Sequence, residues 1–263
     1  MNLILTSLLG FYYKDKEGRK IAHNFGNTNG ILDLIKKLTP KQYNFVFVAS
    51  SESNYETTDT YAQLTFDSFR ITYPFENYII LDGRTKDRTE EIIQNADLIF
   101  LCGGHVPSQN HFFHNINLKE FIKNTDALII GASAGSMNCA EIVYAQPEVE
   151  GESINPLYKR YLQGLALTNI SILPHFEQCI NDMIDGKNIF KEISLPDSKI
   201  RPFIAYSDGA YIYDNGTKQI MYGKAFLFEN GNYLQISNDD TITDITKLVQ
   251  DKFSYNNYNL IKE

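Results

Sequence analysis

The segment from Leu128 to Asn138 reads LIIGASAGSMN. An apolar run typical of a buried strand leads directly into Gly-x-Ser-x-Gly, and a helix-like stretch follows. Small residues are needed around the serine because a tight strand-to-helix turn leaves no room for larger ones. Such a turn would expose the Ser133 hydroxyl at a helix N-terminus, where backbone N–H groups stabilise negative charge. The segment therefore predicts a nucleophilic serine, with a capping serine in an ordinary turn as the alternative.

Similar apolar runs recur through the first half of the chain, each ending in small or polar residues. They are nearly continuous in apolar character, as in strands that are buried on both faces of a parallel sheet. The expected strands are residues 3–8, 44–50, 78–81, 96–102 and 126–130. Apolar residues at helical spacing predict helices at residues 29–38, 88–94 and 117–123. This alternation predicts an α/β fold built from βαβ units with right-handed crossovers.

The second half of the chain has a different pattern. Residues 170–173 are expected to form one more strand, and residues 176–185 a polar helix. From Arg201 onward, Asp-Gly and Asn-Gly turn signals separate short, aromatic-rich segments. These segments predict antiparallel strands on one side of the sheet. Because no repeat and no Pro/Ser-rich linker divides the sequence, residues 1–263 are expected to form a single domain.

Composition and charge argue against several classes of protein. The 263 residues carry a formal net charge of -8, whereas a nucleic-acid partner requires a basic surface. The three cysteines have no ligand-like spacing, which disfavours a disulfide framework or structural zinc and suits a reducing compartment. No apolar run approaches membrane-spanning length, and the first residues lack the features of a signal peptide. We therefore expect a soluble, cytoplasmic protein that binds neither nucleic acid nor membranes.

A serine nucleophile needs a base to activate it. Of the five histidines, only His175 lies downstream of Ser133, and it follows an expected strand. Catalytic groups in open α/β sheets gather beyond the strand ends, so His175 is the expected base, with a structural histidine as the alternative. The cluster of His105, His111 and His114 matches no familiar metal-ligand spacing. These three side chains are predicted to line the substrate site or the surface, and no metal is expected.

The sequence predicts one oxyanion site, with backbone donors from two segments of the chain. The strand at residues 96–102 ends in Gly103 and Gly104, which would allow the backbone to approach a substrate closely. The N–H of Gly104 or His105 could then donate one hydrogen bond to the oxyanion, and the N–H of Ala134 the other. A plain turn is the alternative interpretation of the glycine pair.

Together, the Gly103–Gly104 element, the segment around Ser133 and the sequence Leu-Pro-His-Phe at residues 173–176 resemble the peptidase E (aspartyl dipeptidase) and cyanophycinase family of serine peptidases. The match covers roughly residues 1–230. The resemblance implies a class I glutamine amidotransferase-like, flavodoxin-like fold. This fold is a three-layer, doubly wound, mostly parallel sheet with antiparallel strands in the C-terminal part. It also implies Ser133 as nucleophile, His175 as base and no metal or organic cofactor. Because relatives often pair through their sheets, a homodimer is expected.

The same resemblance offers three candidates for the acid of a catalytic triad. Peptidase E places its acid shortly after the serine helix, and Glu148 stands at the matching offset. Cyanophycinases take it from a later strand, which corresponds to Asp208 here. Class I amidotransferases use a glutamate two residues after the histidine, which corresponds to Glu177. We place Glu148 first, Asp208 second and Glu177 third, because the last role belongs to cysteine enzymes.

The sequence therefore predicts a serine peptidase acting on a dipeptide or short peptide. Peptidase E recognises an amino-terminal aspartate through basic groups, for which Arg160, Lys187 and Arg201 are the candidates in this chain. One alternative is a non-catalytic ligand-binding protein on the same fold. Another is an α/β-hydrolase-type esterase, which is disfavoured because His175 follows Ser133 by only about forty residues.

Overall fold

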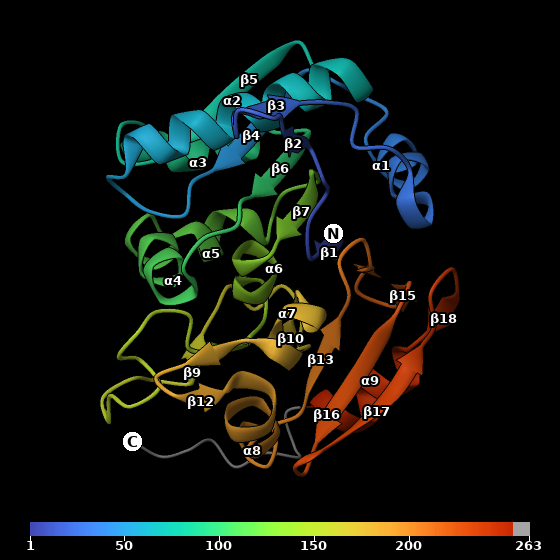
Figure 1. Cartoon of the computed structure of the whole chain (residues 1–263). Helices are drawn as coiled ribbons and strands as arrows, with labels where there is room; N and C mark the ends of the chain where they lie inside the picture. The colour runs from blue at the N-terminus through green and yellow to red at the C-terminus, as the bar shows by residue number, and fades with distance from the viewer. Residues whose placement is uncertain (255–263) are drawn as a thin grey trace.

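The centre of the molecule is an eight-stranded mixed sheet. The computed structural model describes residues 1–254 and is shown in Figure 1. The strand order is β18-β15-β14-β1-β7-β6-β4-β5. The parallel strands are β1 (Asn2–Thr6), β4 (Asn44–Val48), β5 (Asn77–Leu81), β6 (Leu98–Leu101) and β7 (Leu128–Ala132). Three antiparallel strands extend the sheet beyond β1, namely β14 (Tyr211–Asp214), β15 (Gln219–Tyr222) and β18 (Ile242–Asp244).

Helices cover both faces of this sheet, because successive residues of a strand point to opposite sides. The face that carries Phe45 and Phe47 packs against α1 (Ile31–Leu38) and α2 (Tyr55–Thr72). The face that carries Val46 and Val48 packs against four other helices. These are α3 (Thr89–Gln94), α4 (Val106–Asn115), α5 (Leu118–Ile122) and α6 (Ala134–Asn138). The architecture is therefore the three-layer, doubly wound α/β fold that the sequence predicts.

A second, four-stranded sheet lies in the lower half of Figure 1. Its strands are β10 (Ile172–Leu173), β13 (Phe203–Tyr206), β16 (Ala225–Glu229) and β17 (Asn232–Ser237), in that order. Its apolar residues belong to the same buried cluster as Val46 and Val48 of the main sheet. This shared core supports our proposal that residues 1–263 form one domain, of which residues 255–263 lie outside the described part.

The remaining elements connect or flank these layers. Three hairpins are formed by β2 (Tyr12–Lys14) with β3 (Lys20–Ala22), β8 (Ile142–Tyr144) with β9 (Tyr161–Gln163), and β11 (Met183–Ile184) with β12 (Lys187–Asn188). The other helical segments are η1 (Thr28–Gly30), η2 (Lys86–Arg88), α7 (Phe176–Asn181), η3 (Ile189–Ser194), α8 (Leu195–Asp197) and α9 (Thr246–Phe253). Within residues 1–254, no helix has the length and apolar character needed to cross a bilayer.

The structure confirms the six expected strands of residues 3–173 and the four expected helices, with shifted ends. The expectation that the C-terminal strands lie on one side of a single sheet is wrong. The chain alternates between the two sheets there, so that β14, β15 and β18 join the first sheet while β13, β16 and β17 join the second. The strand before His175, β10, also belongs to the second sheet. The helices α2 and α4 and the hairpin β2–β3 were not predicted.

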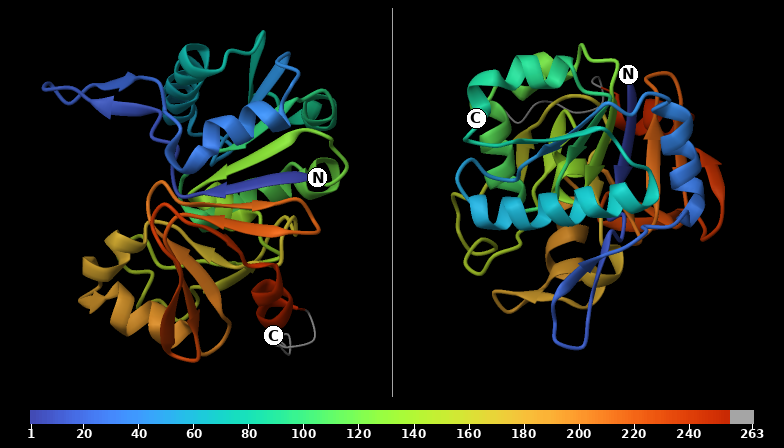
Figure 2. Two further views of the ribbon diagram at one scale, coloured as in Figure 1. Left: turned by 90° about the vertical axis from the view of Figure 1, so that its right-hand side faces the viewer. Right: turned by 90° about the horizontal axis from the view of Figure 1, so that it is seen from above.

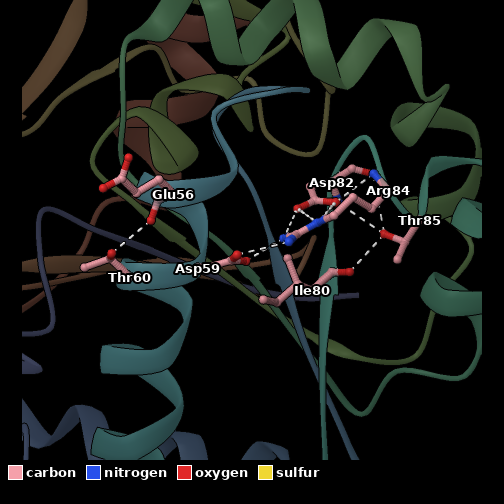
Figure 3. A network of polar contacts seen from close by, with 7 residues as sticks. All are labelled: Glu56, Asp59, Thr60, Ile80, Asp82, Arg84 and Thr85. Carbon is pink, nitrogen blue, oxygen red and sulfur yellow. Dashed lines mark hydrogen bonds and ion pairs between the residues drawn. The ribbon is translucent and has the colours of Figure 1, made fainter.

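The amino-terminal half of α2 is fixed to the end of β5 by an arginine bridge (Figure 3). The guanidinium of Arg84 donates to the carboxylate of Asp82, which is fully buried at the end of that strand, with its shortest N–O distance 2.5 Å. The same guanidinium donates to both carboxylate oxygens of Asp59 on α2, at 3.0 and 2.5 Å. A planar guanidinium can hold two carboxylates in this way, which fixes their relative orientation. The bridge thus sets the position of the helix that carries Tyr61.

Truncation of Phe45 should test the aromatic layer beneath α1 and α2. The ring of Phe45 is fully buried, and its contacts include an edge-to-face pair with Phe69 at 4.6 Å between centroids. Phe45→Ala should lower the free energy of unfolding by about 3–5 kcal/mol, because it removes apolar contacts and leaves a cavity. Urea denaturation measures this change. The nearby Tyr43→Ala is the control, since Tyr43 is 54% exposed. An equal loss in both variants would contradict this assignment of the core.

Candidate active site

Ser133 lies on a sharp turn between β7 and α6. Its backbone adopts φ 51° and ψ −119°, a conformation that costs energy for any residue other than glycine. The neighbouring glycines permit this turn by close packing. A Cβ on Gly131 would lie 2.6 Å from the Cα of Ser136, and one on Gly135 would overlap the carbonyl oxygen of Leu101. The structure therefore confirms the strand–turn–helix geometry that the Gly-x-Ser-x-Gly pattern predicts.

The second sheet brings His175 to this serine. His175 follows β10 and precedes α7, in a left-handed conformation with φ 59°. Its Nε2 lies 3.0 Å from the Oγ of Ser133, and its Nδ1 lies 2.6 Å from Oδ1 of Asp208. In the tautomer with the proton on Nδ1, that N–H donates to the carboxylate, and Nε2 is left to accept the serine proton. The three side chains form a continuous hydrogen-bonded chain, as a nucleophile, a base and an orienting acid require.

Asp208 is held as a carboxylate. It lies in the turn between β13 and β14, which is the point where the chain passes from the second sheet to the first. Partial burial acts to raise its pKa, but the hydrogen bond and charge of His175, together with a hydrogen bond from Ser7, keep the pKa below its ordinary value. The carboxylate can therefore stabilise a positive charge on the imidazole.

The other two candidate acids lie elsewhere. Both ring nitrogens of His175 already have partners, Ser133 and Asp208, and neither partner is Glu148, the candidate that we place first from the sequence. Glu148 instead lines a cavity on the other side of the serine. Glu177 accepts a hydrogen bond at 2.5 Å from the hydroxyl of Ser207, which directs it away from the imidazole. Sequence offsets within the resembling families could not resolve this choice, because the acid is positioned by the connection between two sheets.

The predicted oxyanion elements meet at the same place. Ala134 is the first residue of α6, where a backbone N–H has no intrahelical partner. A Cβ on Gly104 would lie 2.7 Å from the Oγ of Ser50, so this position requires a bare backbone, and a Cβ on Gly103 would make a tight contact of 3.3 Å with the Cβ of Ser133. The ring of His105 is turned away from the serine, because its Nε2 lies 2.7 Å from Oε1 of Glu152. His105 therefore does not point its side chain at the nucleophile.

Cysteine chemistry has no comparable site in the described chain. Cys102, Cys139 and Cys179 are all buried and unpaired. Burial raises the pKa of the Cys102 thiol to about 12 and that of Cys179 to about 11, and it also raises the pKa of Cys139. At neutral pH all three are thiols and weak nucleophiles. The hydroxyl of Ser133, by contrast, lies 3.0 Å from a ring nitrogen of His175.

Two cavities meet at Ser133 and His175. The larger one has a volume of about 590 Å³ and extends from the serine towards α2 and the hairpin β2–β3. The smaller one, of about 300 Å³, lies towards Glu148 and Gln178. Both volumes are in the range of small-molecule sites. The sequence analysis missed the larger cavity because the hairpin β2–β3 and the helix α2, which form one of its walls, are not predicted from the sequence.

The histidines of the predicted cluster hydrogen-bond to neighbouring groups. On α4, Nδ1 of His114 lies 2.8 Å from the carbonyl oxygen of Asn110, and Nε2 of His111 lies 3.2 Å from the amide nitrogen of Asn115. Among residues 1–254, no group of three or more His, Cys, Asp and Glu side chains is arranged to hold a metal ion. These two histidines therefore have local partners within their own helix.

Comparison with known proteins decides the family. The sequence model of Peptidase family S51 matches residues 20–221, which is most of the chain. The chain belongs to peptidase family S51. It is a serine-type peptidase, a hydrolase of peptide bonds, and the resemblance to peptidase E is confirmed. No protein among those with curated descriptions matches the chain.

Solved structures with the same fold agree with membership of family S51. A peptidase from an acI-B1 actinobacterium is 14% identical and superposes with a TM-score of 0.62, covering 92% of this chain and 96% of its own. A protein described as a peptidase E from Listeria monocytogenes EGD-e is 17% identical with a TM-score of 0.53, covering 90% of this chain and 98% of its own. At such low identity the likeness shows the fold alone.

The titration of Glu148 should make the free energy of unfolding of this S51 peptidase depend on pH. Although the residue keeps some exposure, desolvation by the protein around its carboxyl raises the pKa to about 7. The folded state therefore binds this proton more tightly than the unfolded chain. Its contribution to stability is present below the unfolded pKa and is lost as the pH rises through about 7.

The variant Glu148→Gln should not lose this stability as the pH rises, because it has no carboxyl group to titrate at this position. Between about pH 5 and pH 8, the free energy of unfolding of the variant should rise by about 1 kcal/mol relative to wild type, after allowance for solvent screening. Urea denaturation at both pH values measures the difference. Glu150→Gln removes a neighbouring charge on the same loop and serves as the control. Parallel pH profiles for Glu148→Gln and wild type would contradict the raised pKa.

Proposed function

We propose that this peptidase cleaves a dipeptide or short peptide with Ser133 as nucleophile, His175 as base and Asp208 as the orienting acid. The observation that carries the proposal is the hydrogen-bonded chain from Ser133 Oγ to His175 Nε2 at 3.0 Å and from His175 Nδ1 to Asp208 at 2.6 Å. Geometry and roles, not sequence order, define such a triad.

The first half of the reaction forms an acyl-enzyme. His175 Nε2 takes the Ser133 proton as Oγ bonds to the carbonyl carbon of the scissile peptide. The backbone N–H groups of Ala134 and Gly104 are positioned to receive the negative charge that develops on the carbonyl oxygen. The imidazolium then gives its proton to the leaving amine as the C–N bond breaks. Asp208 stabilises the positive charge of the imidazolium throughout this half.

The second half releases the product by the same groups. Water attacks the acyl carbon while Nε2 of His175 takes one of its protons. The proton then passes to Oγ of Ser133 as the acyl–oxygen bond breaks, which restores the free enzyme. No further co-reactant is needed, because the sum of the two halves is hydrolysis of one peptide bond.

The size of the site favours a small substrate. The two cavities at the serine have volumes of about 590 and about 300 Å³, and each lies on its own side of the catalytic groups. Cavities of this size enclose small molecules, whereas a folded protein substrate needs an extended binding surface. A dipeptide or a short peptide fits this arrangement.

An activated serine should react with a fluorophosphonate. We expect a single adduct on wild type by intact-mass measurement, and no adduct on Ser133→Ala or His175→Ala, because the nucleophile or its base is then missing. Ser53→Ala, which removes an exposed serine outside both cavities, should label like wild type. A folded wild-type protein that takes up no reagent would favour a non-catalytic ligand-binding protein on this fold.

Three variants, in each of which one candidate carboxylate is replaced by the corresponding amide, should identify the acid of the triad. Asp208→Asn should lower kcat by about a thousandfold or more, because the amide no longer fixes the imidazole tautomer or stabilises its charge. Glu148→Gln and Glu177→Gln should each stay within about tenfold of wild type, since neither carboxylate contacts the imidazole. Hydrolysis of a dipeptide panel measures all three. A loss confined to Glu148→Gln would instead support the acid that the sequence placed first.

A further inference from the structure

Aromatic rings form one wall of the larger cavity. Phe47 and Phe100 come from the adjacent strands β4 and β6 and stack with their centroids 5.9 Å apart. Phe11, from the segment before β2, meets Phe100 edge to face at 6.2 Å. Phe47 and Phe100 are each only 1% exposed and give the cavity an apolar backing, whereas Phe11 is partly exposed and contributes the more accessible ring. The wall is therefore suited to an apolar side chain of a substrate.

The opposite wall comes from the hairpin β2–β3 and from α2. Tyr12 of the hairpin and Tyr61 of α2 line the cavity, with centroids 6.1 Å apart. Figure 2 shows the tip of the blue hairpin extending away from the body of the molecule, while its base lies beside α2. Lys20 fixes the two elements together, because its Nζ donates to the Tyr61 hydroxyl at 2.6 Å and lies 4.0 Å from the centre of that ring.

The base of the hairpin has further anchors. The N–H of His23 donates to the carbonyl oxygen of Phe11 at 3.2 Å, which joins the two strands below the cavity. The hydroxyl of Ser68 on α2 donates to the carbonyl oxygen of His23 at 2.5 Å. The arginine bridge between Asp59 and Asp82 fixes the same helix to the sheet (Figure 3). The wall is thus positioned before any substrate arrives.

The cavity opens directly at the reacting atoms. Its lining includes Ser133, His175, Gly103 and Gly104 together with the aromatic residues. A side chain that occupies it must therefore belong to a substrate residue beside the scissile bond. A more distant residue would have to bring its side chain past the oxyanion site.

Charge in the cavity gives little support for an acidic side chain. Among the described residues that line it, Lys14 is the one lysine or arginine, and this lysine is exposed on the hairpin. The three basic residues considered from the sequence line neither cavity at the serine. Arg160 pairs with Asp197 at 3.5 Å, Lys187 donates to the carbonyl oxygen of Ser153 at 3.3 Å, and Arg201 donates to the hydroxyl of Ser171 at 3.1 Å.

We infer that the larger cavity binds a large apolar side chain, of aromatic size, on the substrate residue beside the scissile bond. Specificity is set by Tyr12 and Tyr61 on one wall and by Phe11, Phe47 and Phe100 on the wall opposite. The inference rests on the proposed peptidase function. An apolar cavity without a fixed guanidinium binds a carboxylate poorly, because the charge loses its hydration and gains no close partner. The preferred residue is then phenylalanine, tyrosine or leucine, and not aspartate.

Kinetics on a dipeptide panel tests this inference. The panel places Phe, Tyr, Leu, Ala or Asp at either position, and kcat/KM is measured for each substrate. We expect the aromatic substrates to exceed the alanine and aspartate ones by about tenfold to a hundredfold, as burial of one large apolar side chain provides. Fluorophosphonate labelling of the same wild-type preparation reports separately whether the serine is activated.

Two variants, one that enlarges the larger cavity and one that fills it, test whether this cavity determines the preference for aromatic substrates. Phe11→Ala removes part of the wall and should lower kcat/KM for aromatic substrates about tenfold or more, with little change for alanine substrates. Thr57→Trp, at an exposed position of α2 that lines the cavity, should fill it and exclude aromatic substrates while alanine substrates are still cleaved. Tyr43→Ala is the matched control, because it removes an exposed aromatic ring outside this cavity.

The outcomes separate the two proposals. A labelled serine with equal kcat/KM for aromatic, alanine and aspartate substrates would overturn the cavity inference and leave the peptidase function in place. A preference for aspartate that is lost in Lys14→Ala would also overturn it, since the cavity would then recognise an acid through that lysine. No labelling and no hydrolysis by folded wild type would overturn both.

Discussion

The close approach of α6 to β6 and β7 is the constraint on which the site depends. No Cβ fits at Gly135, because the carbonyl oxygen of Leu101 occupies that space, and Gly131 meets the backbone of Ser136 in the same way. Only this contact lets the chain turn from strand to helix within one residue and holds Ser133 at a positive φ. The reactive hydroxyl therefore projects from the sheet because the backbone around it has no alternative path.

The positions of His175 and Asp208 depend on how the two sheets are joined. His175 follows a strand of the second sheet, and Asp208 lies where the chain leaves that sheet for the first. The hydroxyl of Ser7, which follows β1, donates to the carbonyl oxygen of Ser207 at 3.2 Å and holds this connection against the main sheet. The distance between nucleophile and base is thus a property of the packing between sheets, and the shared apolar core maintains it.

Sequence patterns predicted those parts of the fold in which local signal and burial agree. Strands such as β4 and β7 are buried on both faces, so their apolar runs are continuous and easily recognised. The apolar pattern of helix α2 is interrupted because its buried face includes the polar residues Thr58, Thr65 and Ser68. The hairpin β2–β3 has a turn at Gly18 between an aromatic and a lysine-rich segment, which is a weak signal in the sequence. The expected homodimer and cytoplasmic location stay predictions.

The residues of the candidate site differ in the same way in how far the sequence predicts them. Ser133 and His175 could be found because each follows a strand and carries a motif, whereas the placement of Asp208 against His175 depends on a connection between sheets that no spacing reveals.

Under the proposed mode of substrate binding, the projecting hairpin is a specificity element that is separate from the proposed catalytic groups. Its residues contribute a wall to the cavity but none of the three hydrogen-bonded groups at the serine. Changes in its length or composition can therefore alter which peptides are accepted while the reaction itself is conserved. Selection can act on this short segment independently of the chemistry, so that new substrates become accessible through a change in one surface loop.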